Sequence, residues 1–265
     1  MIPEGLLEKR LREGKVHIHR NPNVNVHVQK VFYFGSLNVN EMIRDFYEGL
    51  ARAIFSGSLR NRQTEEDYDI EPDITSPERK RYIEVKAAGH TRRIMLKDDQ
   101  IEKYARLQIS KDPIPNPRIY FTFFRYGTRG IQKQLSGKSE EEALAYFAQH
   151  TRVMVGFPLS IIHKIHKEGF GSNPLATRTS GDLGMSCTNF TTLAFDFFFS
   201  QPEQTIRRFS LYPGNYEIKR RKLGALTINK IPIKPFPFVL IKDTDGYHRK
   251  WISQLREELL RDIPF

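Results

Sequence analysis

Hydrophobic and polar residues alternate in the first part of the chain. From Val16 to Val28 the apolar residues recur at every second position on both sides of a polar turn at residues 20–23. A period of two is typical of a strand with one buried face, so this segment predicts a β-hairpin. Residues 1–13 predict a short helix before it.

A helical period follows the hairpin. From Asn40, which can cap a helix, to about Ser56, apolar residues that include Met42, Phe46 and Leu50 recur three or four positions apart. This spacing places them on one side of a helix. We therefore expect a helix with a single buried face.

The centre of the chain predicts alternating strands and helices. Strands are expected at residues 68–75, 81–88, 118–125 and 152–157, and helices at 98–109, directly after Ser139 and at 159–167. The helix after Ser139 has Glu142 at the position that completes a capping box. The order of elements predicts an α/β fold, a mixed central β-sheet flanked by helices.

Four regions are expected along the chain. Residues 1–39 form an N-terminal helix and hairpin, residues 40–168 form the α/β core, and residues 169–192 form a flexible loop or linker. Residues 193–265 form a basic C-terminal region of short strands and loops before a final helix. The core is expected to end near residue 168, and the basic region to bind nucleic acid.

The net charge of the chain indicates which kind of molecule it can bind. The chain has 42 Lys and Arg against 31 Asp and Glu, a net charge of +11. Such a surface attracts polyanions, although a generally basic protein without a nucleic-acid role is the alternative interpretation. The single cysteine excludes an internal disulfide. Neither a long apolar run nor a signal-peptide core occurs, so we expect a soluble, cytoplasmic protein that does not bind a membrane.

Charged residues interrupt an otherwise apolar strand. Glu84 and Lys86 are two positions apart, so both side chains point to the same face, and Asp73 on the preceding strand can lie beside Glu84 in a hairpin. Converging carboxylates are the hard oxygen ligands that Mg²⁺ prefers. An ordinary Glu–Lys pair on an exposed sheet edge is the structural alternative.

These residues resemble the motif of the PD-(D/E)XK nuclease superfamily. Pro72-Asp73 and, after ten further residues, Glu84-Val85-Lys86 lie on two predicted adjacent strands, with a helix before them and another after them. In the second helix Gln100 and Tyr104 are similar to the Q-xxx-Y element of the RecB-like branch. The cysteine quartet of the iron–sulfur members of that branch is missing. The resemblance covers about residues 40–168 and implies a restriction-endonuclease-like core.

The resemblance also implies roles for individual residues. Asp73, Glu84 and the carbonyl of Val85 would bind the metal, Mg²⁺ with Mn²⁺ as a substitute. Lys86 would orient the attacking water or help to deprotonate it, and would hold the phosphate. A lysine between two carboxylates stays protonated unless the metal offsets their charge, so we favour electrostatic positioning over a role as base. A further acidic residue is often supplied by the first helix, for which we favour Glu48 over Glu41. The predicted catalytic set is Asp73, Glu84, Lys86, Gln100, Tyr104 and Glu48.

Two basic clusters are expected to contact nucleic acid. The first brackets the motif strand and consists of Arg79, Lys80, Arg81, Arg92 and Arg93. The second consists of Lys219, Arg220, Arg221 and Lys222 and has aromatic residues nearby, a mixture suited to phosphates and exposed bases. A solvated basic loop is the alternative for the second cluster.

The predicted function is Mg²⁺-dependent hydrolysis of phosphodiester bonds in double- or single-stranded DNA. A nucleic-acid-binding protein without cleavage and an RNA-processing nuclease are the alternatives. Endonuclease and exonuclease activity both stay open. Cutting both strands of a duplex symmetrically needs two sites, so a homodimer is one assembly to consider.

Two other groups of residues receive structural interpretations. His163 and His166 are three positions apart on a predicted helix but lack a third ligand at matching spacing, so we interpret them as surface histidines. Asp243-Thr244-Asp245-Gly246 lacks the later acidic ligands of a calcium loop, and we interpret it as a hairpin turn.

Overall fold

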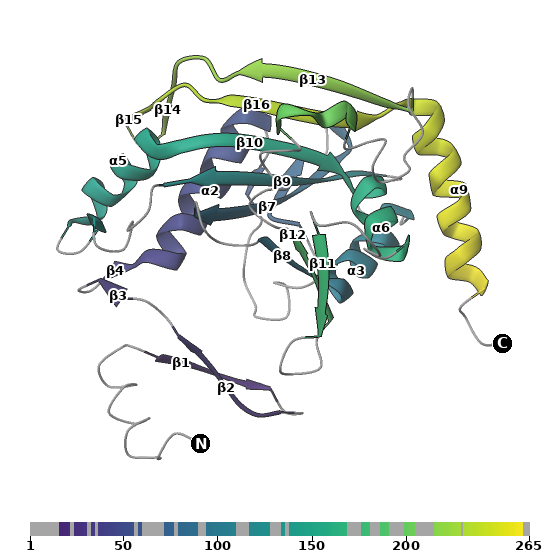
Figure 1. Ribbon diagram of the computed structural model, residues 1–265, viewed down its shortest axis with the longest axis horizontal. Coiled ribbons are helices and arrows are strands. Elements are labelled where there is room, and N and C mark those ends of the chain that lie inside the picture. Colours follow the sequence, from purple (N-terminus) through teal and green to yellow (C-terminus); the bar gives the residue numbers. More distant parts are fainter. Residues whose placement is uncertain are drawn as a thin grey trace.

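Figure 1 shows the computed structural model of the protein. The structure describes residues 16–21, 24–30, 33–34, 37–55, 58–59, 72–76, 79–89, 94–109, 117–127, 134–135, 138–168, 176–180, 186–190, 199–204, 215–228 and 230–261. The helix predicted for residues 1–13 lies outside this part of the chain. Among the described helices, none is long and apolar enough to cross a membrane.

A mixed sheet of seven strands forms the centre of the molecule and confirms the predicted α/β class. Its strand order is β13-β16-β10-β9-β7-β6-β5. The strands are β5 (Ser58–Leu59), β6 (Ile74–Ser76), β7 (Arg81–Gly89), β9 (Arg118–Tyr126), β10 (Thr151–Pro158), β13 (Tyr216–Lys222) and β16 (Pro237–Asp243). The pairs β7–β9 and β10–β16 are parallel, whereas the other four pairs are antiparallel.

Helices cover both faces of the sheet and enclose one hydrophobic core on each (Figure 1). On one face lie α2 (Val39–Phe55) and α5 (Glu140–His150). On the other lie α3 (Asp98–Ile109), α6 (Leu159–Glu168) and α9 (Asp245–Arg261). Each helix follows from its sequence pattern, because apolar side chains at helical spacing form a stripe that must be buried against the sheet.

The central strand and the fifth helix show how the local sequence produces these elements. All residues of β9 after Arg118 are buried, as expected for a nearly continuous apolar strand with helices on both faces. At the start of α5 the Ser139 hydroxyl accepts a hydrogen bond from the Glu142 N–H, and the Glu142 carboxylate accepts one from the Ser139 N–H. The predicted capping box is therefore confirmed.

A second, smaller sheet occupies the region predicted as a loop or linker. Two strands, β11 (Ala176–Ser180) and β12 (Ser186–Phe190), pair with each other, and β12 pairs with β8 (Ile94–Lys97) just before α3. The strands within 169–192 are rich in Ser, Thr and Asn and lack the alternating apolar residues that identify a half-buried strand. The segment therefore resembled a loop in the sequence.

The central sheet continues beyond residue 168, where the sequence predicted the core to end. Strand β16 pairs with β10, β13 forms the outer strand, and α9 packs against the same core as α3 and α6. The described part of the C-terminal region is thus built into the α/β core. Periodicity could not predict this, because strand pairing between distant segments leaves no local pattern in the sequence.

The remaining strands form short antiparallel pairs. The predicted hairpin is confirmed as β1 (Val16–Asn21) paired with β2 (Val24–Lys30). Two smaller pairs join β3 (Tyr33–Phe34) to β4 (Leu37–Asn38) and β14 (Leu226–Ile228) to β15 (Ile231–Ile233).

Candidate active site

The two faces of β7 carry different kinds of side chain. Ile83 and Val85 point into the core beneath α2 and α5, whereas Tyr82 points into the core beneath α3, α6 and α9. Alternation along the strand places Glu84 and Lys86 on the same face as Tyr82. Two charged side chains therefore enter the face of the sheet that α3 covers.

Strand pairing brings Asp73 to Glu84. Strand β6 pairs with β7 in a register that joins Ile74 to Ile83, and one further step in this antiparallel register sets Asp73 opposite Glu84. Directly opposed residues in an antiparallel pair share a face. The Asp73 carboxylate also accepts a hydrogen bond of 2.7 Å from the backbone N–H of Val85. Asp73 is thus held against the strand that carries Glu84 and Lys86.

Helix α3 supplies donors to the Glu84 carboxylate. Gln100 Nε2 donates to Glu84 Oε1 over 2.8 Å, and the Tyr104 hydroxyl donates to Glu84 Oε2 over 2.5 Å. Gln100 also donates to the Tyr104 hydroxyl over 3.1 Å. Lys86 forms an ion pair with the same Glu84 oxygen that Gln100 contacts. Both oxygens of this carboxylate, which is only 3% exposed, are therefore occupied and oriented.

Burial and neighbouring charges shift the pKa values in this cluster. Burial and the adjacent carboxylates of Glu84 and Glu48 raise the pKa of Asp73 to about 8, against the opposing effects of Lys86 and the Val85 N–H. Burial lowers the pKa of Lys86, but the negative charges of Glu84 and Asp73 outweigh it and leave that pKa above its usual value. Lys86 is therefore an ammonium ion at neutral pH.

Glu48 of α2 belongs to the electrostatic surroundings of this cluster. Its side chain is 9% exposed and lies 4.0 Å from the guanidinium of Arg44. Its charge raises the pKa of both Asp73 and Lys86. The structure therefore brings Glu84, Lys86, Gln100 and Tyr104 into direct contact, and it places Asp73, which is bonded to the Val85 N–H, and Glu48 close to them.

The donor set fits a divalent cation that prefers oxygen ligands. Asp73 lies beside Glu84; burial and, after it, the charges of Glu84 and Glu48 raise the pKa of Asp73, and a bound cation would favour its ionised form. Within the described part of the chain, no group of three or more His, Cys, Asp or Glu side chains is arranged to hold a metal. Mg²⁺ binds through one or two carboxylates and keeps several waters, so two carboxylates with a backbone carbonyl are sufficient.

The predicted nucleic-acid-binding residues lie in two separate places. Arg79 and Lys80 are exposed directly before β7, and Arg81 begins that strand. Arg92 and Arg93 lie outside the described residues. The second cluster, Lys219 to Lys222, lies on β13, the outer strand, four strand positions from β7. At about 4.8 Å per strand this corresponds to about 19 Å from the catalytic strand.

Sequence reasoning missed a lysine among these basic residues. Burial lowers the pKa of Lys242 on β16, and the charges of Arg81, Lys219 and Arg221 lower it further. Positive charges from both predicted clusters therefore lower the pKa of the same lysine, Lys242. The proximity of Lys242 to these residues depends on the pairing of β13 with β16 and on the order of strands in the sheet. The sequence could not predict it, because the residues are far apart along the chain.

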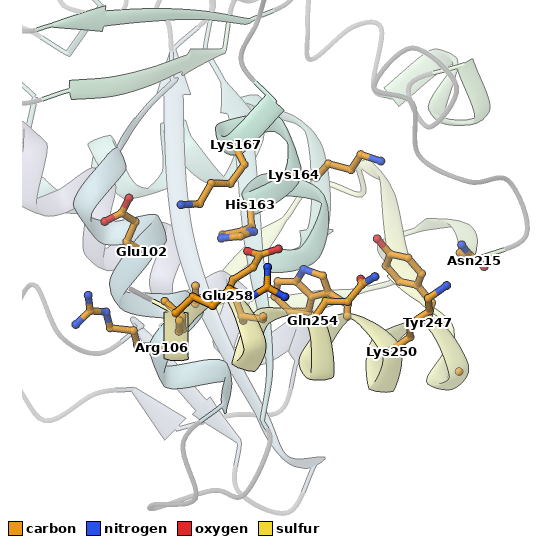
Figure 2. Close-up of a pocket in the computed structure, with 16 residues that line it drawn as sticks. Glu102, Arg106, His163, Lys164, Lys167, Asn215, Tyr247, Lys250, Gln254 and Glu258 are labelled. Atoms are coloured by element: carbon orange, nitrogen blue, oxygen red, sulfur yellow. The ribbon is translucent and has the colours of Figure 1, made fainter. Parts of the chain in front are cut away.

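A cavity of about 830 Å³ lies between α3, α6 and α9 and is separate from the carboxylate cluster. Figure 2 shows Glu102 and Arg106 of α3 beside it, together with His163, Lys164 and Lys167 of α6. Glu84 does not line it. The side chains of Gln100 and Tyr104 contact Glu84, whereas those of Glu102 and Arg106, on the same helix, line the cavity.

The interpretation of two histidines as surface residues is wrong. His163 and His166 are only 6% and 4% exposed. His163 packs edge-on against Trp251 of α9, and burial, aided by the positive charge of Lys167, lowers its pKa to about 4. His166 lies 3.4 Å from the carboxylate of Asp98. The helix α6 is enclosed by α3 and α9, which the sequence did not predict as its neighbours.

The segment Asp243–Gly246 is also not a hairpin turn. Asp243 ends β16, Asp245 begins α9, and the Thr244 carbonyl accepts the first helical hydrogen bond, from the His248 N–H. Asp243 is buried and accepts hydrogen bonds from Ser160 and His248. It therefore connects a strand to a helix.

Comparison with protein-family models, with curated proteins and with solved structures finds no match for this chain. The function is therefore inferred from the geometry of the side chains around Glu84.

Proposed function

We propose that this protein is a Mg²⁺-dependent nuclease that hydrolyses phosphodiester bonds in DNA, built on a restriction-endonuclease-like core. One observation carries the proposal. Asp73, directly before β6, accepts a hydrogen bond from the Val85 N–H next to Glu84, while Lys86, Gln100 and Tyr104 all contact the Glu84 carboxylate. These five residues are the ones by which the sequence resembles the PD-(D/E)XK superfamily. An ordinary exposed Glu–Lys pair would need neither the buried carboxylate nor the donors from α3.

Asp73 and Glu84, with the carbonyl of Val85, would hold the cation. When bound, Mg²⁺ would offset negative charge on the phosphate and favour ionisation of a bound water. The side chains of α3 act on Glu84: their hydrogen bonds fix the direction of its oxygens, as outer-shell donors do for metal-binding carboxylates.

Lys86 would contact the phosphate with its ammonium group. Burial lowers its pKa, but the charges of Glu84 and Asp73 outweigh burial and favour the ammonium form before a cation binds, which supports a role in holding the phosphate. Its side chain is 28% exposed and therefore accessible from solvent, unlike Glu84. Its charge would steady the phosphate oxygens as negative charge accumulates in the transition state.

The test is a gel assay on linear, circular, single-stranded, flapped and four-way DNA, with matched RNA, in Mg²⁺ or Mn²⁺. We expect cleavage of at least one DNA substrate, and Lys86→Ala should abolish it while leaving DNA affinity intact. Lys103→Ala is the matched control, because Lys103 is an exposed α3 residue paired with Asp99 and lies outside the cluster. If the wild-type protein binds DNA but cuts none with either metal, the alternative of a non-catalytic binding protein is correct.

A further inference from the structure

A second, smaller cavity of about 450 Å³ lies where the β6–β7 connection, the start of β9 and the start of α9 meet. Arg79 and Lys80 line it from the connection, and Arg118 lines it from β9. Helix α9 contributes residues from one of its sides, among them Arg249 and Arg256, which are two turns apart. None of the predicted catalytic residues lines this cavity.

The charge of this cavity has one sign. Five of its lining residues are Lys or Arg, and none of the described residues that line it is acidic. One of these cations is held by carboxylates: Arg118 donates to the backbone and side chain of Asp243 and forms an ion pair with Asp245. The concentration of positive charge at one small cavity favours an anion there.

A buried histidine supplies an independent sign of a ligand. His248 lines the cavity, is 7% exposed, and its Nδ1 lies 3.2 Å from the Asp243 carboxylate. A carboxylate accepts, so Nδ1 carries the hydrogen. The other ring nitrogen, Nε2, is buried and has no hydrogen-bond partner among the described residues. An unsatisfied buried polar atom is costly, and a ligand at the cavity would remove that cost.

The backbone of the cavity is held in place before any ligand binds. Lys80 has a left-handed conformation with φ of 49°, which is unfavourable for a residue with a side chain. Its carbonyl accepts a hydrogen bond of 2.8 Å from the Arg118 N–H, which ties the connection to β9. Strained residues fixed in this way are concentrated at ligand sites.

We propose that this cavity binds a phosphate group. Guanidinium groups match phosphate oxygens with paired hydrogen bonds, and an imidazolium form of His248, with Nδ1 still donating to Asp243, would add Nε2 as a further donor. As an extension that depends on the proposed nuclease function, the phosphate belongs to the backbone of the bound DNA strand. Arg79 and Lys80, which line the cavity, directly precede β7, the strand that carries Glu84.

The first experiment measures affinity for a fluorescent DNA duplex in EDTA across a salt series. Arg249→Gln with Arg256→Gln should weaken binding about tenfold or more and reduce the slope of log affinity against log salt by about 2. Lys250→Gln with Arg261→Gln is the matched control: it removes the same charge from α9 at residues that line the cavity of Figure 2. Equal losses in the two double variants would overturn the assignment to the DNA backbone.

The second experiment tests the phosphate site without DNA. Inorganic phosphate should shift the His248 side-chain nitrogen resonances in a saturable way, chloride at equal ionic strength should not, and the Arg249/Arg256 double variant should lose the shift. His248→Phe, checked for folding by its thermal transition, should weaken DNA binding in the same direction as the double variant. No saturable shift would overturn the phosphate site.

The two proposals can fail separately. If the wild-type protein cuts no DNA but phosphate shifts His248, the nuclease function is wrong and the phosphate site stands. If the protein cuts DNA and neither experiment separates the variants, the phosphate site is wrong and the nuclease function stands.

Discussion

At the scale of the residue, the Tyr104 hydroxyl donates the shortest of the hydrogen bonds from α3 to Glu84, 2.5 Å to Oε2. Tyr104→Phe removes this donor and keeps the ring that packs near Phe121. We expect DNA cleavage to fall about 10- to 100-fold with little change in stability, because loss of an outer-shell donor misorients the carboxylate. Cleavage rates of Tyr104→Phe and of the control Tyr247→Phe on α9 measure this effect, and equal rates would contradict it.

The raised pKa of Asp73 predicts that metal binding releases a proton. Its pKa of about 8 means that the carboxyl group is mostly protonated at pH 7 before a cation binds. Mg²⁺ binding should therefore release about one proton at pH 7, and affinity should rise as pH approaches 8. Calorimetry in buffers with different ionisation enthalpies counts this proton, and Asp73→Asn should abolish its release. Binding without buffer dependence in the wild-type protein would refute the prediction.

The resemblance to the PD-(D/E)XK motif was sufficient to predict which residues meet at Glu84. Strand alternation placed Glu84 and Lys86 on one face, and helical spacing placed Gln100 and Tyr104 one turn apart. The surroundings of His248 could not be predicted, because Arg79, Lys80 and Arg118, which line the same cavity, are more than 100 residues away in the sequence. Local periodicity contains no information on such contacts.

At the scale of the element, the capping box at the start of α5 contributes to stability independently of the active site. Ser139→Ala removes the acceptor for the Glu142 N–H and should lower the free energy of unfolding by about 1 kcal/mol. Ser139→Asp, which preserves a capping oxygen, should stay close to the wild type. Urea unfolding of the three proteins measures this, and equal midpoints would show that the cap contributes nothing.

Elements with strong periodicity were predictable and those without it were not. The predicted helix at 98–109 has the same bounds as α3. The strand β8 has only four residues and precedes α3 directly, and β11 and β12 carry mostly polar residues. Their pairing, more than the character of their side chains, makes them strands.

At the scale of the whole molecule, His163 should make the folded state sensitive to acid. Its pKa of about 4 lies below the usual 6.5, so the unfolded chain takes up the proton first as pH falls. Stability that is present above pH 6.5 is therefore lost as pH falls toward 4, by about 3 kcal/mol at most.

The comparison of His163→Gln with the wild type isolates this effect. The raised pKa of Asp73 acts in the opposite direction, since its contribution is present at low pH and is lost as pH rises through 8. It acts equally in both proteins. Urea unfolding between pH 7 and pH 4 should therefore show a shallower loss in the variant, and identical pH profiles would contradict the prediction.

The outer strand β13 has a consequence for the behaviour of the protein at high concentration. Among the described strands it lies at one end of the sheet order, so its outer edge could add a strand from another copy of the chain. The run from Lys219 to Lys222 places four consecutive basic residues there. Lys219 and Arg220 form ion pairs with Glu217 and Glu203, and the remaining excess of positive charge opposes the edge-to-edge approach of two copies. These basic residues therefore oppose fibrillar association, and substituting them with neutral residues should increase aggregation at high protein concentration.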